Sequence, residues 1–162
     1  GTTFKLSIPY ASANPEIKKE QIEYKSVENP VNKNTILVVE DIDINYMLIE
    51  EFFEEYKSAY KLIHARNGLE AYEYCIKNKD IDLVLMDIKL PIMNGNEALK
   101  RIRKKRPDLP IIAQTAFSSR KDEQEALSFG YSDFISKPLS REQVLKKVRN
   151  FLKTDIKEVY NG

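Results

Sequence analysis

The chain has 162 residues, of which 42% are hydrophobic and 31% charged, with a formal net charge of +1. This size and balance suit one globular domain and argue against nucleic-acid binding by charge alone. No apolar run approaches the roughly 18 residues of a membrane span, and no signal-peptide pattern opens the chain. The single cysteine excludes an internal disulfide and fits a reducing compartment. We therefore expect a cytoplasmic α/β domain.

The first 34 residues differ in texture from the rest of the chain. Residues 1–9 alternate like one β-strand and end at a proline. Residues 10–34 are polar and contain two further prolines and the charged run EIKKEQIEYK. That run is compatible with a short helix, but it has no convincing apolar stripe. Residues 10–34 are therefore interpreted as a linker.

Five short runs with strand character follow, and longer segments of helical period separate them. The runs are Thr35–Val39, Tyr60–His64, Asp82–Met86, Pro110–Ala113 and Ser132–Ile135. The first and third are almost continuously apolar, as expected of parallel strands covered on both faces. We expect a doubly wound five-stranded parallel sheet with helices on both faces over residues 35–153, and a tail over residues 154–162.

The first and last helical segments carry an apolar stripe that predicts which helix face packs on the sheet. In the first segment the stripe consists of Ile44, Met47, Leu48, Phe52 and Tyr56. In the last segment it consists of Val144, Leu145, Val148, Phe151 and Leu152. Ser140 with Gln143 resembles a capping box for the last helix. Asn67–Gly68 resembles the turn that opens the second.

Polar side chains gather where the predicted strands end. They are Glu40 and Asp41 after the first strand, Asp87 after the third, Thr115 after the fourth and Lys137 after the fifth. Ligands of open parallel sheets bind at these carboxyl ends. Three carboxylates would repel one another unless a cation lies among them, and oxygen ligands of this type suit Mg²⁺. A lysine and a hydroxyl would complement a transferring phosphoryl group, with an aspartate as nucleophile.

Each of these residues alone has an ordinary structural interpretation, as a helix cap, a loop contact or a solvated lysine. The joint pattern is more specific. The stretches ILVVEDIDIN, DLVLMDIKLPIMNG, PIIAQTAF and DFISKPL closely resemble the signature blocks of response-regulator receiver domains, over roughly residues 35–153. The resemblance implies a flavodoxin-like receiver fold. It implies that Asp87 is the phosphoacceptor, and that the metal ligands are Asp41, Asp87, the backbone carbonyl of Lys89 and, partly through water, Glu40.

The same resemblance assigns roles around the phosphorylation site. Glu40 departs from the commoner Asp but keeps the carboxylate. Thr115 and Lys137 would bind phosphoryl oxygens, and Phe134 takes the position of an aromatic switch residue. Phosphorylation is expected to couple Thr115 to Phe134 and to remodel the face formed by the fourth helix, the fifth strand and the fifth helix. The Lys137–Pro138 peptide is expected to be cis.

Several loop residues are expected to shape or shield the site. Pro91 and Gly95 would shape the loop after Asp87, with Gly95 in a backbone conformation disfavoured for other residues. Phe117 and Lys89 would border the path by which water attacks the phosphoaspartate. The Lys89 side chain either contacts a phosphoryl oxygen or points to solvent, and solvent is favoured.

Three further features are interpreted as structural. His64, the only histidine, is not followed by the glutamate of a phosphodonor motif. Cys75 lies in a helical segment and is expected to be inert packing. The basic run RIRKKRP at residues 101–107 ends the third helix, where cations complement the helix dipole. No organic cofactor, nucleic acid or membrane contact is expected for this stretch of chain.

The opening GTTFKLSIP resembles the last glycine-motif strand of histidine-kinase ATP-binding domains, and the block EDIDIN with Asn45 resembles receivers fused to kinases. Residues 1–9 are therefore interpreted as a remnant of that ATP-binding domain. The chain as a whole is interpreted as the C-terminal receiver of a hybrid sensor histidine kinase, and that parent protein could be membrane-anchored. Its partner would be a phosphohistidine domain of a kinase or a histidine phosphotransfer protein, and a dimer is an open alternative. We expect a phosphoacceptor switch, with neither nucleotide binding nor an output domain in this sequence.

Other interpretations were weighed. A free-standing single-domain response regulator remains the alternative, although the strand-like start argues against it. An aspartyl-phosphate phosphatase would need a carboxylate two residues after the nucleophile, where Lys89 stands. A flavodoxin-like FMN carrier would need a Ser/Thr/Gly phosphate loop after the first strand, which EDIDIN does not provide.

Overall fold

The computed structural model describes residues 33–116, 124 and 127–152. Five strands form one sheet: β1 (Asn34–Val39), β2 (Tyr60–Ala65), β3 (Ile81–Asp87), β4 (Ile111–Thr115) and β5 (Asp133–Ser136). All neighbouring strands are parallel, in the order β2-β1-β3-β4-β5. Each strand lies within two residues of its expected bounds. The predicted five-stranded parallel sheet is confirmed, and its strand order reverses between β1 and β3.

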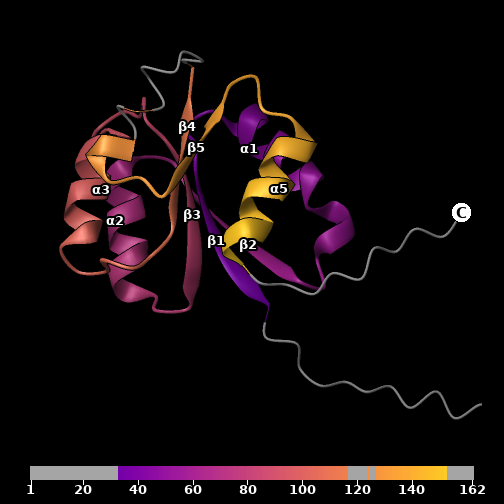
Figure 1. Ribbon diagram of the computed structural model, residues 1–162, viewed down its shortest axis with the longest axis horizontal. Helices are drawn as coiled ribbons and strands as arrows, with labels where there is room; N and C mark the ends of the chain where they lie inside the picture. The colour runs from indigo at the N-terminus through magenta and orange to yellow at the C-terminus, as the bar shows by residue number, and fades with distance from the viewer. Residues whose placement is uncertain (1–32, 117–123, 125–126, 153–162) are drawn as a thin grey trace, which may run out of the picture.

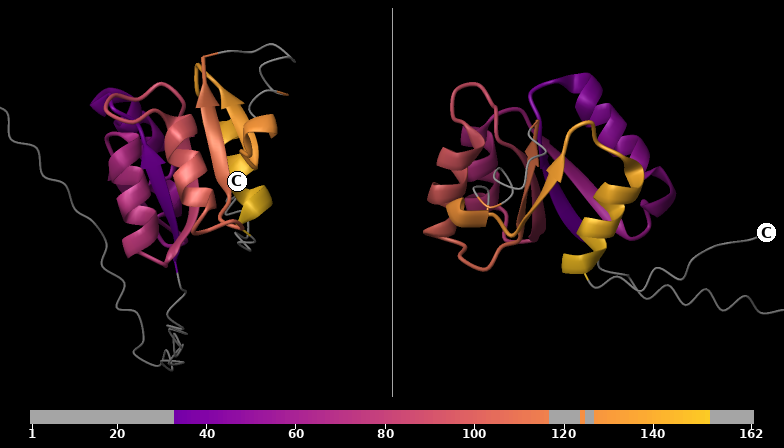
Figure 2. Two further views of the ribbon diagram at one scale, coloured as in Figure 1. Left: turned by 90° about the vertical axis from the view of Figure 1, so that its left-hand side faces the viewer. Right: turned by 45° about the horizontal axis from the view of Figure 1, so that its top comes forward.

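Helices cover both faces of this sheet (Figure 1). They are α1 (Asp43–Phe52), α2 (Gly68–Lys77), α3 (Gly95–Arg103) and α5 (Arg141–Phe151), with a 3₁₀ turn η1 (Glu54–Tyr56) after α1. Helices α2 and α3 lie on one face, and α1 and α5 on the other (Figures 1 and 2). Among the described residues, no helix is long and apolar enough to cross a membrane.

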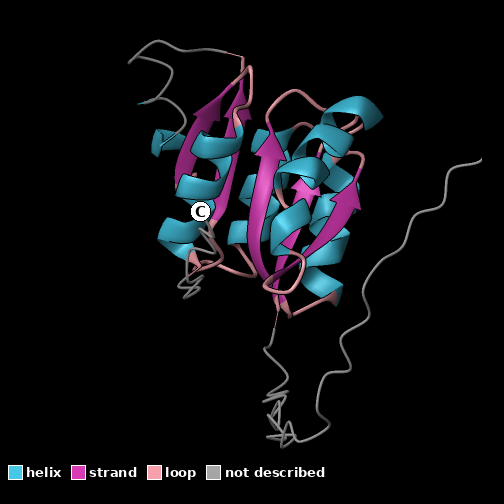
Figure 3. Ribbon diagram, turned by 90° about the vertical axis from the view of Figure 1, so that its right-hand side faces the viewer, coloured by secondary structure: helices cyan, strands magenta, loops and turns pink. Residues whose placement is uncertain are grey.

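Two apolar layers fill the space between the sheet and its helices, which explains the continuous apolar strands. Leu37 and Val84 point into the layer under α2 and α3. Their chain neighbours Ile36 and Leu83 point into the layer under α1 and α5. Because successive side chains of a strand point to opposite faces, a strand covered on both faces is mostly apolar along its length. The strands run alongside one another toward a common edge (Figure 3).

The apolar stripe expected for the first helix is confirmed at Phe52 and at half-buried Tyr56, and it is wrong for its other three residues. Ile44, Met47 and Leu48 are exposed by 69%, 58% and 45%, whereas Ile49 and Phe52 are buried. Helix α1 is apolar on more than one face, so periodicity alone could not select the stripe that meets the sheet. The helix also ends at Phe52, before the 3₁₀ turn. In α5 the expected stripe is confirmed, because Val144, Leu145, Val148 and Leu152 are buried and Phe151 is half-buried.

Side-chain caps begin three of the four helices. The Asn67 side chain accepts a hydrogen bond from Glu70 N at the start of α2, and Asn94 accepts one from Glu97 N at the start of α3. Ser140 Oγ accepts from Gln143 N, which confirms the expected cap of α5. Each cap satisfies a backbone donor that the first helical turn leaves without a partner. Helix α1 follows Ile42 and has no such cap.

The loop from β3 to α3 is tightly packed against its surroundings. A Cβ atom on Gly95 would lie 2.3 Å from the Asp87 carbonyl oxygen, and one on Gly68 would lie 2.4 Å from the Met93 carbonyl oxygen. The expectation of an unusual backbone conformation at Gly95 is wrong: among the described residues, only Ile92 and Gly130 have positive φ. Gly95 is required because two backbones approach closely, and no side chain fits between them.

Ile92 adopts a left-handed backbone conformation, with φ of 65°, and its side chain is 80% exposed. A β-branched residue in this region is strained by about 1–2 kcal/mol, and an exposed side chain recovers little of that by burial. Asparagine tolerates the conformation. We expect Ile92→Asn to raise the free energy of unfolding by about 1 kcal/mol in urea titrations. Ile92→Val keeps the strain and should give no gain; equal gains in both variants would contradict the explanation.

Candidate functional site

Three carboxylates meet where β1 and β3 end. Glu40 and Asp41 follow β1, and Asp87 is the last residue of β3. Oxygen atoms of the three side chains all lie within 4.8 Å of one another. Glu40 is fully buried and Asp87 is 7% exposed, whereas Asp41 is open to solvent. The parallel register brings these residues together because adjacent β1 and β3 end at the same edge of the sheet.

Lys137, just after β5, reaches across to two of these carboxylates. Its Nζ atom lies 2.6 Å from Asp87 Oδ2 and 2.9 Å from Glu40 Oε2. Its backbone N–H donates to the Thr115 carbonyl at 2.7 Å, which ties the end of β5 to the end of β4. The Lys137–Pro138 peptide is cis, as expected. The structure therefore gathers residues from four strand ends around Lys137.

The charge state of Lys137 follows from two opposing effects. Burial by itself lowers the pKa of the ammonium, because it disfavours the charged form. Hydrogen bonds to Asp87 and Glu40, together with the two carboxylate charges, outweigh burial and raise the pKa above its ordinary value. Stability from these ion pairs is present below the ordinary lysine pKa and is lost only as pH rises through the raised value. Lys137 is therefore charged at neutral pH.

The backbone orients the Asp87 side chain. Asp87 Oδ1 accepts a hydrogen bond from the Lys89 N–H at 2.9 Å. The Lys89 side chain is exposed at the rim of an open cavity beside the loop from β3 to α3. The role of the Lys89 carbonyl as a metal ligand stays a prediction. Phe117, expected to shield the phosphoaspartate, lies outside the described residues.

Thr115 and Phe134 lie on neighbouring strands near the same edge. Thr115 ends β4 and is 5% exposed; on β5, half-buried Phe134 pairs with Ala113, two residues before Thr115, and Thr115 itself pairs with Ser136. Lys147 of α5 lies over the Phe134 ring, with Nζ 4.8 Å from the ring centroid. The same Nζ is 2.6 Å from Asp133 Oδ1, which also accepts from the Phe134 N–H at 2.8 Å. Sequence patterns did not indicate that Lys147 and Asp133 flank the switch position.

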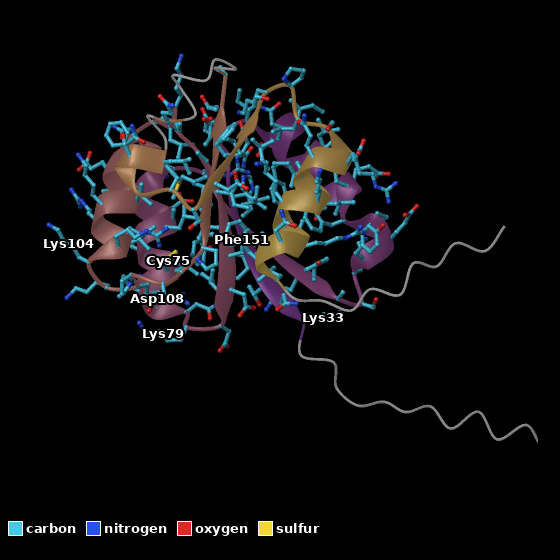
Figure 4. The ribbon with its side chains drawn as sticks, in the orientation of Figure 1. Lys33, Cys75, Lys79, Lys104, Asp108 and Phe151 are labelled. Carbon is cyan, nitrogen blue, oxygen red and sulfur yellow. The ribbon has the colours of Figure 1, made fainter. Side chains whose placement is uncertain are left out.

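The features interpreted as structural have structural contacts. Cys75 is fully buried, and burial raises the pKa of its thiol to about 11. The Arg103 guanidinium donates to the carbonyls of Gly130, Pro107 and Leu109. Arg106 donates in the same way to the carbonyls of Asn78 and Lys79 before β3 and of Ile81, the first residue of β3. These arginines therefore fasten loops, and Figure 4 shows their neighbours Lys104 and Asp108 at the end of the domain away from the carboxyl ends of the strands.

His64 and Asn45 both contact Glu40, which sequence reasoning missed. Asn45 Nδ2 donates to Glu40 Oε1 at 2.8 Å, and His64 Nε2 lies 2.8 Å from the Glu40 carbonyl oxygen. This contact does not change the interpretation that His64 is not a phosphodonor. Asn45 follows Glu40 by five residues and lies in the first turn of α1. This short spacing was the sequence signal that could have predicted the contact between the Asn45 amide and Glu40.

Comparison with known proteins agrees with this geometry. Residues 36–149 match the family model described as the response regulator receiver domain. The chain is 34% identical over 120 residues to the polar-differentiation response regulator DivK of Brucella anthropi, covering 73% of this chain and 95% of DivK. It is 36% identical over 142 residues to hybrid signal transduction histidine kinase B of Dictyostelium discoideum, covering 79% of this chain but only 7% of that kinase.

Solved structures give the same result. The receiver domain of a Pseudomonas aeruginosa sensor histidine kinase, with a magnesium ion in its active-site cleft, superposes with a TM-score of 0.67 at 27% identity, covering 75% of this chain and 99% of that one. A chain from the Saccharomyces cerevisiae complex of the histidine phosphotransfer protein Ypd1 with the Ssk1 receiver domain gives 0.66 at 32% identity, covering 74% and 88%. The chain belongs to the response regulator receiver family and is a receiver domain of two-component signalling.

Proposed function

We propose that Asp87 accepts a phosphoryl group from a phosphohistidine, with Mg²⁺ bound by Glu40, Asp41, Asp87 and the backbone carbonyl of Lys89. The observation that carries this proposal is the meeting of three carboxylates, with Lys137 bridging two of them. Asp87 is oriented by the Lys89 N–H and by Lys137, which suits a nucleophile that must meet phosphorus in one direction.

The charge at the site fits a divalent cation. Three carboxylates carry three negative charges and Lys137 carries one positive charge, which leaves two negative charges uncompensated. Oxygen ligands with room for water suit Mg²⁺, because this ion keeps part of its hydration shell. When bound, Mg²⁺ would neutralise charge on the phosphoryl oxygens during transfer.

The chain's own residues account for the rest of the chemistry. A carboxylate oxygen of Asp87 forms a bond to phosphorus while the bond from phosphorus to the histidine nitrogen breaks. The electron pair of that bond leaves with the imidazole, so no proton is taken from Asp87. Lys137 and the Thr115 hydroxyl donate to phosphoryl oxygens, where negative charge must be stabilised.

The exposed apolar surface of α1 suits a docking partner. It consists of Ile42, Ile44, Met47 and Leu48, which are 45% to 69% exposed. Helix α1 begins two residues after Asp41, so this surface adjoins the carboxylates. A contiguous patch of exposed apolar side chains is more often an interaction surface than a part of the surface without a partner. We assign this surface to the protein that carries the phosphohistidine, such as a kinase domain or a histidine phosphotransfer protein.

Phosphorylation is proposed to act on Phe134 through Thr115. A phosphoryl oxygen draws the Thr115 hydroxyl toward the site, and the Phe134 ring turns into the space that it vacates. The ring lacks the tyrosine hydroxyl, so Lys147 over its face and packing against the apolar layer under α2 and α3 hold it in the position seen here, while Asp133 accepts from the backbone N–H of Phe134. This motion would remodel the face of β5 and α5 together with the helix before β5.

The parent protein is proposed to be a cytoplasmic signalling chain that contains a hybrid histidine kinase. The similarity to the Dictyostelium hybrid kinase over 142 residues supports this, as does the resemblance of residues 1–9 to a kinase strand. Those nine residues lie outside the described part of the chain. The alternative is a free-standing response regulator, which the similarity to DivK over 95% of its length favours. A dimer stays a prediction.

Asp87→Asn should abolish phosphorylation, because an amide cannot form the acyl phosphate. We expect acetyl phosphate with Mg²⁺ to label wild type and not Asp87→Asn, measured by intact-protein mass spectrometry. Asp80→Asn changes an exposed acid away from the site and should label like wild type. Equal labelling of Asp87→Asn at another residue would exclude Asp87 as the acceptor.

Met47→Asp should separate docking from chemistry. A charge in the apolar α1 surface should slow phosphoryl transfer from a phosphorylated histidine phosphotransfer protein, with Ypd1 as the probe, by about tenfold, equivalent to 1.4 kcal/mol of docking energy. Labelling by acetyl phosphate should stay unchanged. Tyr74→Asp on the exposed side of α2 serves as the control. Equal slowing by both variants, or slowing with acetyl phosphate as well, contradicts the docking assignment.

Lys147→Met should shift Phe134 toward its activated position. Loss of the cation over the ring removes about 1 kcal/mol, which changes a two-state population roughly fivefold. We expect NMR resonances of Phe134 in unphosphorylated Lys147→Met to move toward those of wild type bound to beryllofluoride. Lys146→Met removes an exposed neighbouring cation and should leave them in place. Spectra of Lys147→Met that coincide with those of unliganded wild type would refute this role.

A further inference from the structure

Glu40 has a longer and more flexible side chain than the aspartate that it replaces in the receiver pattern. It is nevertheless fully buried, so its carboxylate needs hydrogen-bond partners within the protein. The two oxygens have different partners: Oε2 is 2.9 Å from Lys137 Nζ, and Oε1 accepts from Asn45 Nδ2 at 2.8 Å. The Asn45 amide therefore fixes the rotation of the carboxylate relative to the lysine.

The backbone of Glu40 is held from the neighbouring strand. Its N–H donates to the Ala65 carbonyl at 3.0 Å, and its carbonyl oxygen is 2.8 Å from His64 Nε2. Because a carbonyl only accepts, Nε2 must carry the hydrogen of this bond. The Tyr46 ring stacks on His64 with centroids 3.9 Å apart and planes within 4°. That stack fixes the orientation of the imidazole.

Two consecutive residues of α1 thus restrain the side chain and the backbone of Glu40. Asn45 binds the carboxylate directly, and Tyr46 braces the histidine that binds the carbonyl. We propose that Asn45 and His64 are positioning residues that orient Glu40 for the divalent cation and so set the affinity of the site for Mg²⁺. The proposal rests on the function proposed above, in which Glu40 is part of the metal site.

The expected effect follows from the competition between Lys137 and the metal for Glu40. Without the Asn45 amide, Oε1 is a buried charged oxygen without its donor, and the carboxylate is free to turn both oxygens toward Lys137. Turned in this way, Glu40 no longer presents an oxygen to the cation or its water. Residues that orient a metal ligand typically change metal affinity by about 10–100-fold when removed.

The experiment is a set of Mg²⁺ titrations of the whole chain by isothermal calorimetry. We expect Asn45→Ala to weaken Mg²⁺ binding by about tenfold. His64→Phe keeps an aromatic ring against Tyr46 and removes the hydrogen bond, and it should weaken binding in the same direction but less. Glu51→Gln changes an exposed residue of the same helix outside the docking surface and should bind like wild type. Urea unfolding without Mg²⁺ confirms that each variant is folded. If Asn45→Ala does not fold, Asn45→Ser replaces it.

A double-mutant cycle separates positioning from general damage to the fold. In a Glu40→Ala background, Asn45→Ala should cause no further loss of Mg²⁺ affinity, because the residue that it orients is gone. Two results would overturn the positioning role while leaving the proposed function intact. One is that the losses of Mg²⁺ affinity from Asn45→Ala and Glu40→Ala add in the double variant. The other is that Glu40→Ala binds Mg²⁺ more weakly but Asn45→Ala binds it like wild type. Absence of Mg²⁺ binding by wild type, or unchanged binding by Asp41→Asn, would overturn both.

Discussion

Crowding of like charges at one edge of the sheet is the constraint on which the site depends. Glu40 is fully buried and Asp87 nearly so, with Asp41 less than 5 Å away. Two unit charges 4 Å apart interact by roughly 4 kcal/mol at an effective dielectric of 20, so this arrangement needs compensation. Lys137 supplies one positive charge and contacts both buried acids. Because it compensates only part of the charge, the site keeps net negative charge, which supports the divalent cation proposed above.

The surrounding backbone is arranged to hold that crowded edge in place. Gly95 lets the start of α3 press against the Asp87 carbonyl, and Gly68 lets the start of α2 press against the Met93 carbonyl. The Lys137 N–H ties the end of β5 to Thr115. Tight packing of this kind keeps the carboxylates at fixed distances, which a metal site requires. Strain at Ile92 is the local cost of the turn that makes this packing possible.

Helix α1 connects the chemistry to recognition, because its faces serve different purposes. Ile49 and Phe52 pack on the sheet. Asn45 and Tyr46, in its first turns, orient Glu40 directly and through His64. Met47 and Leu48 remain exposed beside the site. If the exposed face binds the proposed partner, that partner would contact the same helix that holds the Glu40 carboxylate.

The sequence by itself determined the order of the strands and helices and which carboxylates meet at the end of the sheet. Thr35–Val39 and Asp82–Met86 are apolar after their first residue because both faces of a parallel strand are covered, and this signal is local. Topology then requires Glu40, Asp41 and Asp87 to meet, because parallel strands end at one edge.

Only the tertiary structure decided which face of α1 is buried, because that helix carries apolar residues on more than one side. It also corrected the reason for Gly95, which is a close backbone approach and not an unusual φ. The contacts of His64 with Glu40 and of Lys147 with Phe134 join segments whose separation no periodicity encodes. Such pairings depend on distances across the fold, and those distances are set only when the helices pack on the sheet.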